Sequence, residues 1–185
     1  SGREKLQRVL NETARLEMIA ANTLSLGGDL AIRTQPVELD SIAAEVIELL
    51  RPQFQHQHIV LQFEPGCETS LPLDADRVKQ ALLNLLVNAA DELVKGGEVS
   101  VATHCGEHDA TLIVEDDGPG IAADKRDALF DNPTSDKKFG LGLGLVVARQ
   151  VVEAHGGELT VMDSERLGGA KFRMEFPRPE KVVTE

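Results

Sequence analysis

The fold is decided between Asp74 and Leu145, where the chain contains three informative pieces: DADRVKQALLNLLVNAADEL (74–93), LIVEDDGPGI (112–121) and the start of LFDNPTSDKKFGLGLGLVVARQ (129–150). The first piece is predicted to be a helix, because Asp74 is a suitable N-cap residue and apolar residues recur at helical spacing. Asn84 and Asn88 stand four residues apart in this helix, so both amides project from nearly the same face.

The other two pieces combine an apolar run or a polar loop with glycines. The second piece is a predicted strand that breaks into a turn at Gly118 and Gly120. The third begins as a polar loop and continues into Gly140, Gly142 and Gly144, after which a helix is predicted. Taken singly, these patterns are typical of a polar helix position, a tight turn and close packing. The occurrence of all three patterns in this order and spacing is much harder to explain by such ordinary structural roles.

In this order, the three motifs resemble the Bergerat-fold ATPases: histidine kinases, type II topoisomerases, large heat-shock chaperones and mismatch-repair ATPases. The run GLGLGL and the later VVEAHGGELTV (151–161) are similar specifically to bacterial sensor histidine kinases. The resemblance implies an α/β sandwich in which helices cover one face of a mixed β-sheet. The predicted grouping of strands with helices favours the same architecture.

The resemblance also implies a site for ATP and Mg²⁺. Asn88 matches the Mg²⁺ ligand, and an amide oxygen is a hard donor suited to that ion. Asn84, one turn earlier, is the weaker candidate. Asp116 matches the residue that reads adenine, because its carboxylate accepts a hydrogen bond from the exocyclic amine. Guanine has a carbonyl there, so its rejection is worth roughly 1.5–3 kcal/mol.

Glycines and lysines account for the remaining contacts that the resemblance implies. Gly118 and Gly120 let the backbone approach the base without a Cβ in the way. Alternate glycines before a helix offer bare N–H groups and a helix N-terminus to the phosphates. Lys137 or Lys138 would neutralise the terminal phosphate, and the sequence leaves open which one does so. The other matched nucleotide-site positions are Phe130, Thr134, Gly140, Leu141, Gly142, Leu143 and Gly144.

Two other phosphate-binding motifs are excluded. The chain contains no Gly-x-x-x-x-Gly-Lys-Ser/Thr, so it is not a P-loop protein. The glycines at 140, 142 and 144 lack the dinucleotide-binding spacing, and they follow a polar loop rather than a strand.

Composition limits the partners. Among 185 residues, 19 Lys and Arg stand against 31 Asp and Glu, which gives a net charge of −12. This acidity argues against nucleic acid or an anionic membrane as a partner. No apolar run approaches the ~18 residues of a membrane span. We therefore expect a cytoplasmic chain whose Cys67 and Cys105 are reduced thiols, with any membrane segment of the parent upstream.

Three regions are predicted. Residues 1–28 resemble the second helix of the dimerisation and histidine-phosphotransfer hairpin, although an ordinary amphipathic helix remains an alternative. Residues 29–177 form the catalytic ATP-binding domain, and residues 178–185 a flexible tail. Further strands are predicted over residues 30–35, 58–64, 71–73, 99–105, 111–116, 157–162 and 170–176, and further helices over residues 42–52, 122–129 and 141–155.

The acceptor histidine of such kinases is not found in this chain. His56, His58, His104, His108 and His155 lack the helical setting and acidic neighbour of an acceptor, so each is predicted to be structural or superficial. We therefore expect the chain to bind ATP without phosphorylating itself.

The leading hypothesis is the catalytic part of a two-component sensor histidine kinase. It would transfer the γ-phosphoryl group to a histidine on a missing helix, for relay to a response-regulator Asp, with a homodimer as the full enzyme. Two alternatives remain: a nucleotide-gated protein-interaction module, and an ATP-hydrolysing member of the superfamily. For hydrolysis, Asp91 and Glu92 lie beyond Asn88, whereas the family's catalytic Glu precedes the Asn, and Asn84 stands at the preceding turn.

Overall fold

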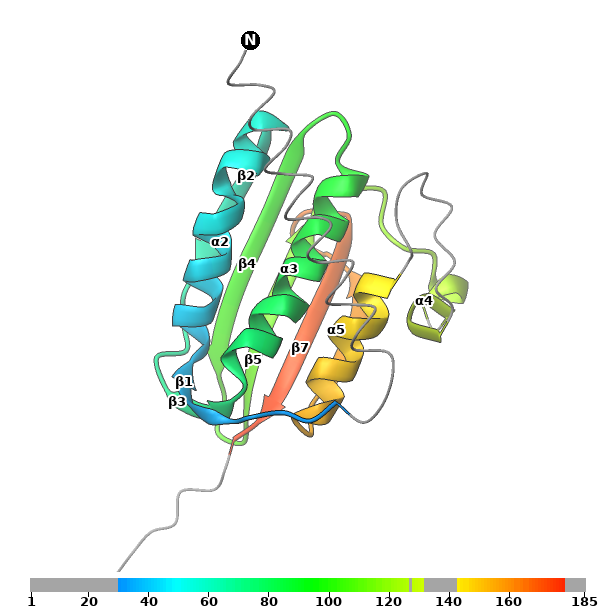
Figure 1. The fold of residues 1–185 in the computed structure, drawn as a ribbon. Helices are drawn as coiled ribbons and strands as arrows, with labels where there is room; N and C mark the ends of the chain where they lie inside the picture. Colours follow the sequence, from blue (N-terminus) through cyan, green and yellow to red (C-terminus); the bar gives the residue numbers. More distant parts are fainter. Residues whose placement is uncertain (1–29, 127, 132–142, 179–185) are drawn as a thin grey trace, which may run out of the picture.

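The computed structural model describes residues 30–126, 128–131 and 143–178. They form two layers, in which three long helices cover one face of a β-sheet (Figure 1). The helices are α2 (Leu39–His56), α3 (Ala75–Glu92) and α5 (Leu143–Ala154). A 3-10 turn (Ala123–Lys125) and α4 (Ala128–Asp131) lie between β5 and α5 along the chain.

The sheet is mixed, as predicted. Its five strands run in the order β2-β4-β5-β7-β6. β2 and β4 pair in parallel, whereas every other pair in this sheet is antiparallel. The strands are β2 (Ile59–Glu64), β4 (Gly97–Cys105), β5 (Asp109–Asp116), β6 (Glu158–Asp163) and β7 (Ala170–Pro177). β1 (Gln35–Glu38) and β3 (Ser70–Leu73) form a separate antiparallel pair.

Aliphatic and phenylalanine side chains build the core between the layers. Strand alternation directs every second residue of the central strands to one face. These residues are almost fully buried: Val99, Val101, Leu112, Val114, Phe172, Met174 and Phe176. The buried residues of α3 repeat at helical spacing, which confirms the predicted amphipathic helix.

The N-terminus of α3 is fixed by one local and one long-range hydrogen bond. The Asp74 carboxylate accepts from the Arg77 N–H at 3.2 Å, as expected of an N-cap. The Asp74 N–H itself donates to His155 Nε2 at 2.9 Å, and His155 Nδ1 lies 2.7 Å from the Val151 carbonyl oxygen. Both ring nitrogens of His155 are therefore engaged, which confirms its predicted structural role.

Two element boundaries near prolines were wrong. The first strand begins at Gln35 and contains Pro36, whereas it was predicted to end before this residue. Pro36 lies opposite Pro72 in a two-stranded pair, where missing N–H groups cost little. α2 was predicted to end near Pro52 but continues to His56. Phe54, in that last turn, is fully buried, and its burial outweighs the hydrogen bond that Pro52 removes.

The prediction of two reduced thiols was also wrong in this structure. Cys67 and Cys105 form a disulfide with a Cα–Cα distance of 4.8 Å. The two cysteines are 38 residues apart, so their spacing gave no sign of contact. Asp40, in the first turn of α2, accepts from the Cys67 N–H at 3.0 Å and so holds the loop between β2 and β3 against α2.

Some predictions fall on residues that the structure does not describe. These are the helix predicted within residues 1–28, most of the polar loop before Gly140, and the tail beyond Arg178. In the described ranges, no helix has the length and apolar character needed to cross a bilayer.

Candidate functional site

Asp116 occupies the last position of β5, and its side chain is 4% exposed. Its Oδ1 accepts from the Gly118 N–H at 2.9 Å and from the Ala170 N–H at 3.2 Å. Among the described residues, both hydrogen bonds to this carboxylate end on Oδ1. The second oxygen, Oδ2, is therefore the one suited to accept from a ligand amine.

Burial controls the charge state of this carboxyl. Desolvation raises the pKa of Asp116 above its ordinary value, and the two backbone N–H groups partly offset that rise. The nearby charges of Asp117 and Glu92 raise the pKa further. A carboxyl with a raised pKa in a confined position is typical of a binding or catalytic site rather than of a surface aspartate.

The two glycines predicted to approach the base follow Asp116. A Cβ built on Gly118 would stand 2.8 Å from Asp116 Oδ1, so this position has no room for a side chain next to the carboxylate. Gly120 has a φ of +68°, which L-residues other than glycine rarely adopt. The turn after β5 therefore requires glycine for two separate reasons.

Gly169 belongs to the same site, and the sequence analysis missed it. A Cβ on Gly169 would stand 2.4 Å from both Asp116 O and Asp116 Oδ1, and 2.6 Å from the Gly118 nitrogen. The Gly169 N–H also donates to the Asp116 carbonyl oxygen at 3.1 Å. In the sequence, Gly169 lies only between the strands predicted over residues 157–162 and 170–176. Its contact with Asp116 depends on the pairing of β7 with β5.

The two asparagines lie on α3. Asn84 is 3% exposed, whereas Asn88 is half-buried. A Cβ on Gly144 would stand 3.5 Å from Asn84 Cγ and Oδ1, so the first turn of α5 packs against this amide. The structure thus brings together two motifs that are about 60 residues apart in the sequence.

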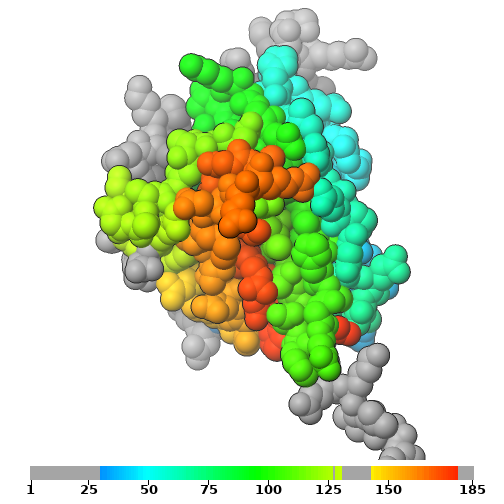
Figure 2. Space-filling model, turned by 180° about the vertical axis from the view of Figure 1, so that it is seen from behind, coloured from blue at the N-terminus to red at the C-terminus, as the bar shows by residue number. Residues whose placement is uncertain are grey.

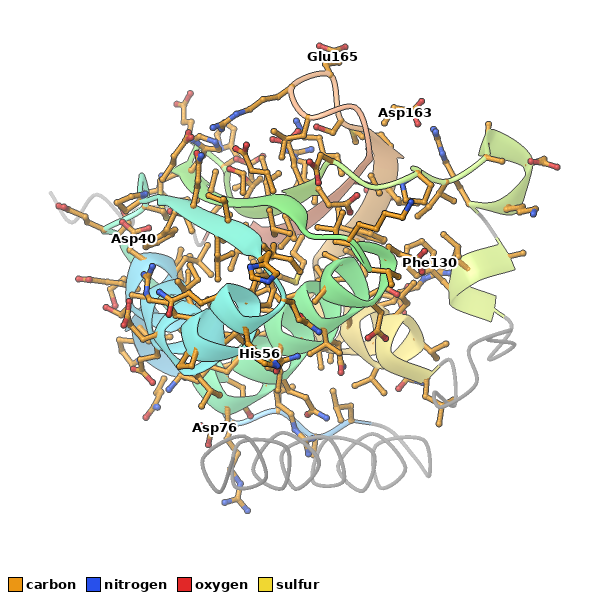
Figure 3. The ribbon with its side chains drawn as sticks, turned by 90° about the horizontal axis from the view of Figure 1, so that it is seen from above. Asp40, His56, Asp76, Phe130, Asp163 and Glu165 are labelled. Atoms are coloured by element: carbon orange, nitrogen blue, oxygen red, sulfur yellow. A yellow bond between two sulfur atoms is a disulfide. The ribbon has the colours of Figure 1, made fainter. Side chains whose placement is uncertain are left out.

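Phe130 lies beside α5. It is 9% exposed, and the Arg149 guanidinium carbon stands 5.5 Å from the centre of its ring. Arg149 also pairs with Glu153 at 2.7 Å. Figure 3 shows Phe130 between α4 and α5, at the edge of the helical layer. This aromatic side chain fixes the short α4 to the main body by burial and a cation–π contact.

Several predicted site residues lie outside the described part of the chain. They are Thr134, Lys137, Lys138, Gly140, Leu141 and Gly142. Leu143 and Gly144 are described and begin α5. The geometry of the candidate site is therefore known only for the predicted residues on β5, the turn after it, α3, α4 and the start of α5.

These residues support a definite chemistry. A buried carboxylate with one fixed oxygen accepts one directed hydrogen bond, which suits an exocyclic amine on a planar base. Amide groups on α3 supply hard oxygen donors, and the start of α5 supplies the positive end of a helix dipole.

Several known proteins are similar to this chain. Residues 73–180 match the family described as histidine kinase-, DNA gyrase B- and HSP90-like ATPase. The sensor histidine kinase ZraS of Salmonella typhimurium is 33% identical over 177 residues, covering 94% of this chain and 38% of that protein. The adaptive-response sensory kinase SasA of Nostoc sp. is 30% identical over 187 residues, covering 93% of this chain and 45% of that protein.

A solved structure agrees with these relatives. The nucleotide-free catalytic domain of histidine kinase ThkA has a TM-score of 0.72 and 26% identity, covering 80% of this chain and 99% of that one. The present chain spans less than half the length of the two curated relatives.

Proposed function

Because the chain belongs to the histidine kinase-, DNA gyrase B- and HSP90-like ATPase family, we propose that it is the ATP-binding catalytic portion of a two-component sensor histidine kinase. The sensor kinases among its relatives support this choice within the family. The reaction would move the γ-phosphoryl group of ATP to a histidine outside this chain, for relay to a response-regulator Asp. The intact enzyme would be a homodimer with this portion in the cytoplasm.

The state of Asp116 carries the proposal. Two backbone N–H groups hold its Oδ1, and the side chain is almost fully buried. In our proposal, Oδ2 accepts a hydrogen bond from the adenine amine, with Gly118 and Gly120 leaving room for the base. Guanine would bring a carbonyl oxygen to the same carboxylate and be rejected.

Asn88 is the proposed protein ligand of Mg²⁺, with Asn84 supporting it from the buried side of α3. Within the described residues, no three acidic, histidine or cysteine side chains gather into a metal site. An amide donor fits Mg²⁺ here, because this ion commonly keeps waters and substrate phosphate oxygens as its other ligands. When bound, the ion would supply charge neutralisation at the phosphates.

The remaining roles concern the phosphates. The N–H groups of Gly140, Gly142 and Gly144 and the start of α5 would bind them, and Lys137 or Lys138 would balance charge on the terminal group. Transfer forms a bond between Pγ and an imidazole nitrogen and breaks the bond from Pγ to the bridging oxygen. ADP leaves with that electron pair. The protein contributes positioning and charge neutralisation.

Calorimetric titration of Mg·ATP into the wild-type chain and into Asp116→Asn tests the proposal. The chain contains no tryptophan, so heat is a practical signal. We expect saturable binding of ATP by the wild type and at least tenfold weaker binding of ATP by the variant. GTP should bind to the wild type at least tenfold more weakly than ATP. A folded wild type that does not bind ATP would overturn the proposal.

Phosphotransfer needs a second experiment with a separate hairpin that carries an acceptor histidine. We expect Mg·ATP and this chain to label that histidine, and Asp116→Asn to label it far more slowly. Steady ATP hydrolysis that is lost in Asn84→Ala, with nucleotide binding intact, would instead favour an ATP-hydrolysing enzyme.

A further inference from the structure

The loop between β6 and β7 and the start of β7 form hydrogen bonds with two consecutive residues of β5, Glu115 and Asp116, whose side chains lie on opposite faces of the sheet. The Gly169 N–H donates to the Asp116 carbonyl oxygen at 3.1 Å. On the helix-covered face, the Ala170 N–H donates to Asp116 Oδ1 at 3.2 Å. On the other face, Ser164 Oγ donates to Glu115 Oε1 at 3.1 Å. Consecutive strand residues point to opposite faces, so the six-residue loop 164–169 and the first residue of β7 together contact both side chains.

Ser164 organises this loop. Its N–H donates to the Gly169 carbonyl oxygen at 2.9 Å, and its own carbonyl oxygen accepts from the Gly168 N–H at 2.9 Å. Its Oγ accepts from the Leu167 N–H at 2.9 Å while donating to Glu115. Ser164 is 3% exposed and Glu115 is 8% exposed, so solvent cannot easily replace these bonds.

Two basic side chains, Lys171 of β7 and Arg166 of the loop, make further contacts on the uncovered face. Lys171 Nζ lies 3.5 Å from Glu115 Oε1, which balances the charge of the buried carboxylate. Arg166 extends to the far edge of the sheet, where it contacts Glu64 at 2.6 Å and Gln62 at 3.2 Å. In Figure 2 the orange segment that contains this loop lies across the upper part of the uncovered face.

We propose that Ser164 is a positioning residue for adenine recognition, acting through the loop that leads into Gly169 and Ala170, whose N–H groups donate to Asp116. This inference rests on the proposed function, because it assigns Asp116 to the adenine amine. Without the Ser164–Glu115 bond, the loop of residues 164–169 loses its buried hydrogen bond on the uncovered face and keeps only the exposed contacts of Arg166 there. The Gly169 and Ala170 N–H groups then hold Asp116 less firmly, and the carboxylate samples orientations that do not meet the amine.

The first test compares Ser164→Ala with Glu165→Gln as a matched control. Glu165 is exposed and points away from the sheet (Figure 3), so its amide variant changes loop charge without touching Asp116. Titrations use Mg·ATP and Mg·ITP, which differ at the position of the exocyclic amine. We expect Ser164→Ala to bind ATP about tenfold more weakly with ITP affinity unchanged, and Glu165→Gln to match the wild type.

A general loosening of the fold would weaken ATP and ITP equally, and that result would overturn the proposal. Unchanged ATP affinity in a folded Ser164→Ala would also overturn it. Glu115→Gln keeps an acceptor for Ser164 and should retain most ATP affinity, whereas Glu115→Ala should reproduce Ser164→Ala. The double variant Ser164→Ala, Glu115→Ala should lose no more ATP affinity than Glu115→Ala alone, because each single variant already removes the Ser164–Glu115 bond.

Hydrogen exchange separates this proposal from the proposed function, because it needs no nucleotide. In the nucleotide-free chain, we expect the Gly169 and Ala170 amides to exchange about tenfold faster in Ser164→Ala, while amides in the middle of β4 keep their rates. Unchanged exchange at both amides would refute the positioning role even if ATP binds. A wild type that fails to bind ATP, but shows the faster exchange in the variant, would refute only the adenine assignment.

Discussion

Gly169 lies directly against the carboxylate of Asp116, so that a Cβ on the glycine would stand 2.4 Å from Asp116 Oδ1. The backbone φ of Gly169 is not in the left-handed region, so the requirement for glycine arises from space alone. The neighbouring Gly168 shows the opposite case. Its φ is +88°, but a Cβ there would meet nothing within 4 Å. A substitution at Gly169 therefore tests steric crowding at the site, whereas one at Gly168 tests backbone strain next to it.

Gly169→Ala is expected to weaken Mg·ATP binding at least tenfold, because β5 or β7 must shift and overpacking costs about 1–3 kcal/mol. Gly168→Ala is expected to lower the free energy of unfolding by about 1 kcal/mol through left-handed strain, with ATP affinity near that of the wild type. Calorimetric titration and thermal unfolding of both variants check the contrast. Equal ATP affinities in the two variants would contradict it.

Asp116→Asn is expected to be more stable than the wild type at neutral pH. Burial raises the pKa of Asp116 in the folded state, so the folded chain holds this proton more tightly than the unfolded chain does. The resulting stabilisation is complete below the ordinary aspartate pKa of 3.8 and is lost as the pH rises through the higher folded value. The asparagine carbonyl oxygen can still accept from both backbone N–H groups.

Thermal unfolding of both proteins between pH 4 and pH 8 checks this prediction, using the difference in Tm at each pH. We expect the advantage of Asp116→Asn to be largest near pH 8 and to shrink towards pH 4. A difference independent of pH would show that the charge of Asp116 costs no stability. Together with weaker ATP binding, the expected result would mark Asp116 as a residue kept for binding at the expense of stability.

Much of the fold was predictable because local signals agreed with tertiary packing. Alternating apolar residues placed β4, β5, β6 and β7 to within about two residues of their observed ends. Where a proline was taken to end an element, the predicted boundary was wrong. α2 continues past Pro52 because Phe54 is buried against residues distant in sequence, which a local rule cannot take into account.

The candidate site was predictable where a motif is continuous along the chain. Asp116, Gly118 and Gly120 belong to one turn, so their spacing alone identified them. The contacts to Asp116 from Gly169 and Ala170 cross 53 and 54 positions, and they exist only once β7 pairs with β5. The Cys67–Cys105 disulfide was missed for the same reason, since the pairing of β2 with β4 sets up the contact.

Asn88→Ala is expected to remove the effect of Mg²⁺ on ATP binding while leaving binding without the ion unchanged. The reason is that the variant loses the proposed amide ligand but keeps the contacts to adenine. Titration of ATP with Mg²⁺ and with a chelator, on the wild type and on the variant, checks this. If Mg²⁺ increased the ATP affinity of the variant as much as that of the wild type, the ion would have to be bound by ligands other than Asn88.

Gly144→Ala is expected to leave the fold intact, because the added Cβ would make ordinary contacts with Asn84 at 3.5 Å. Replacing glycine near the start of α5 should stabilise the chain by about 0.4–1 kcal/mol. If Gly144 serves the phosphates, ATP affinity should fall despite the higher stability. Denaturant unfolding and calorimetric titration measure the two effects separately, and unchanged affinity would assign Gly144 to packing alone.

Reduction of the Cys67–Cys105 disulfide is expected to lower the free energy of unfolding by up to about 4 kcal/mol, by the chain-entropy relation for a loop of this length. The ATP affinity should not change, because Asp40, which bonds to Cys67, lies on the opposite side of the molecule from Phe130 (Figure 3). Denaturant unfolding with and without reductant measures the effect. The double variant Cys67→Ser, Cys105→Ser is the control, and its unfolding should not respond to reductant. A wild type that is equally insensitive and titrates as two free thiols would show that the bond does not form in solution.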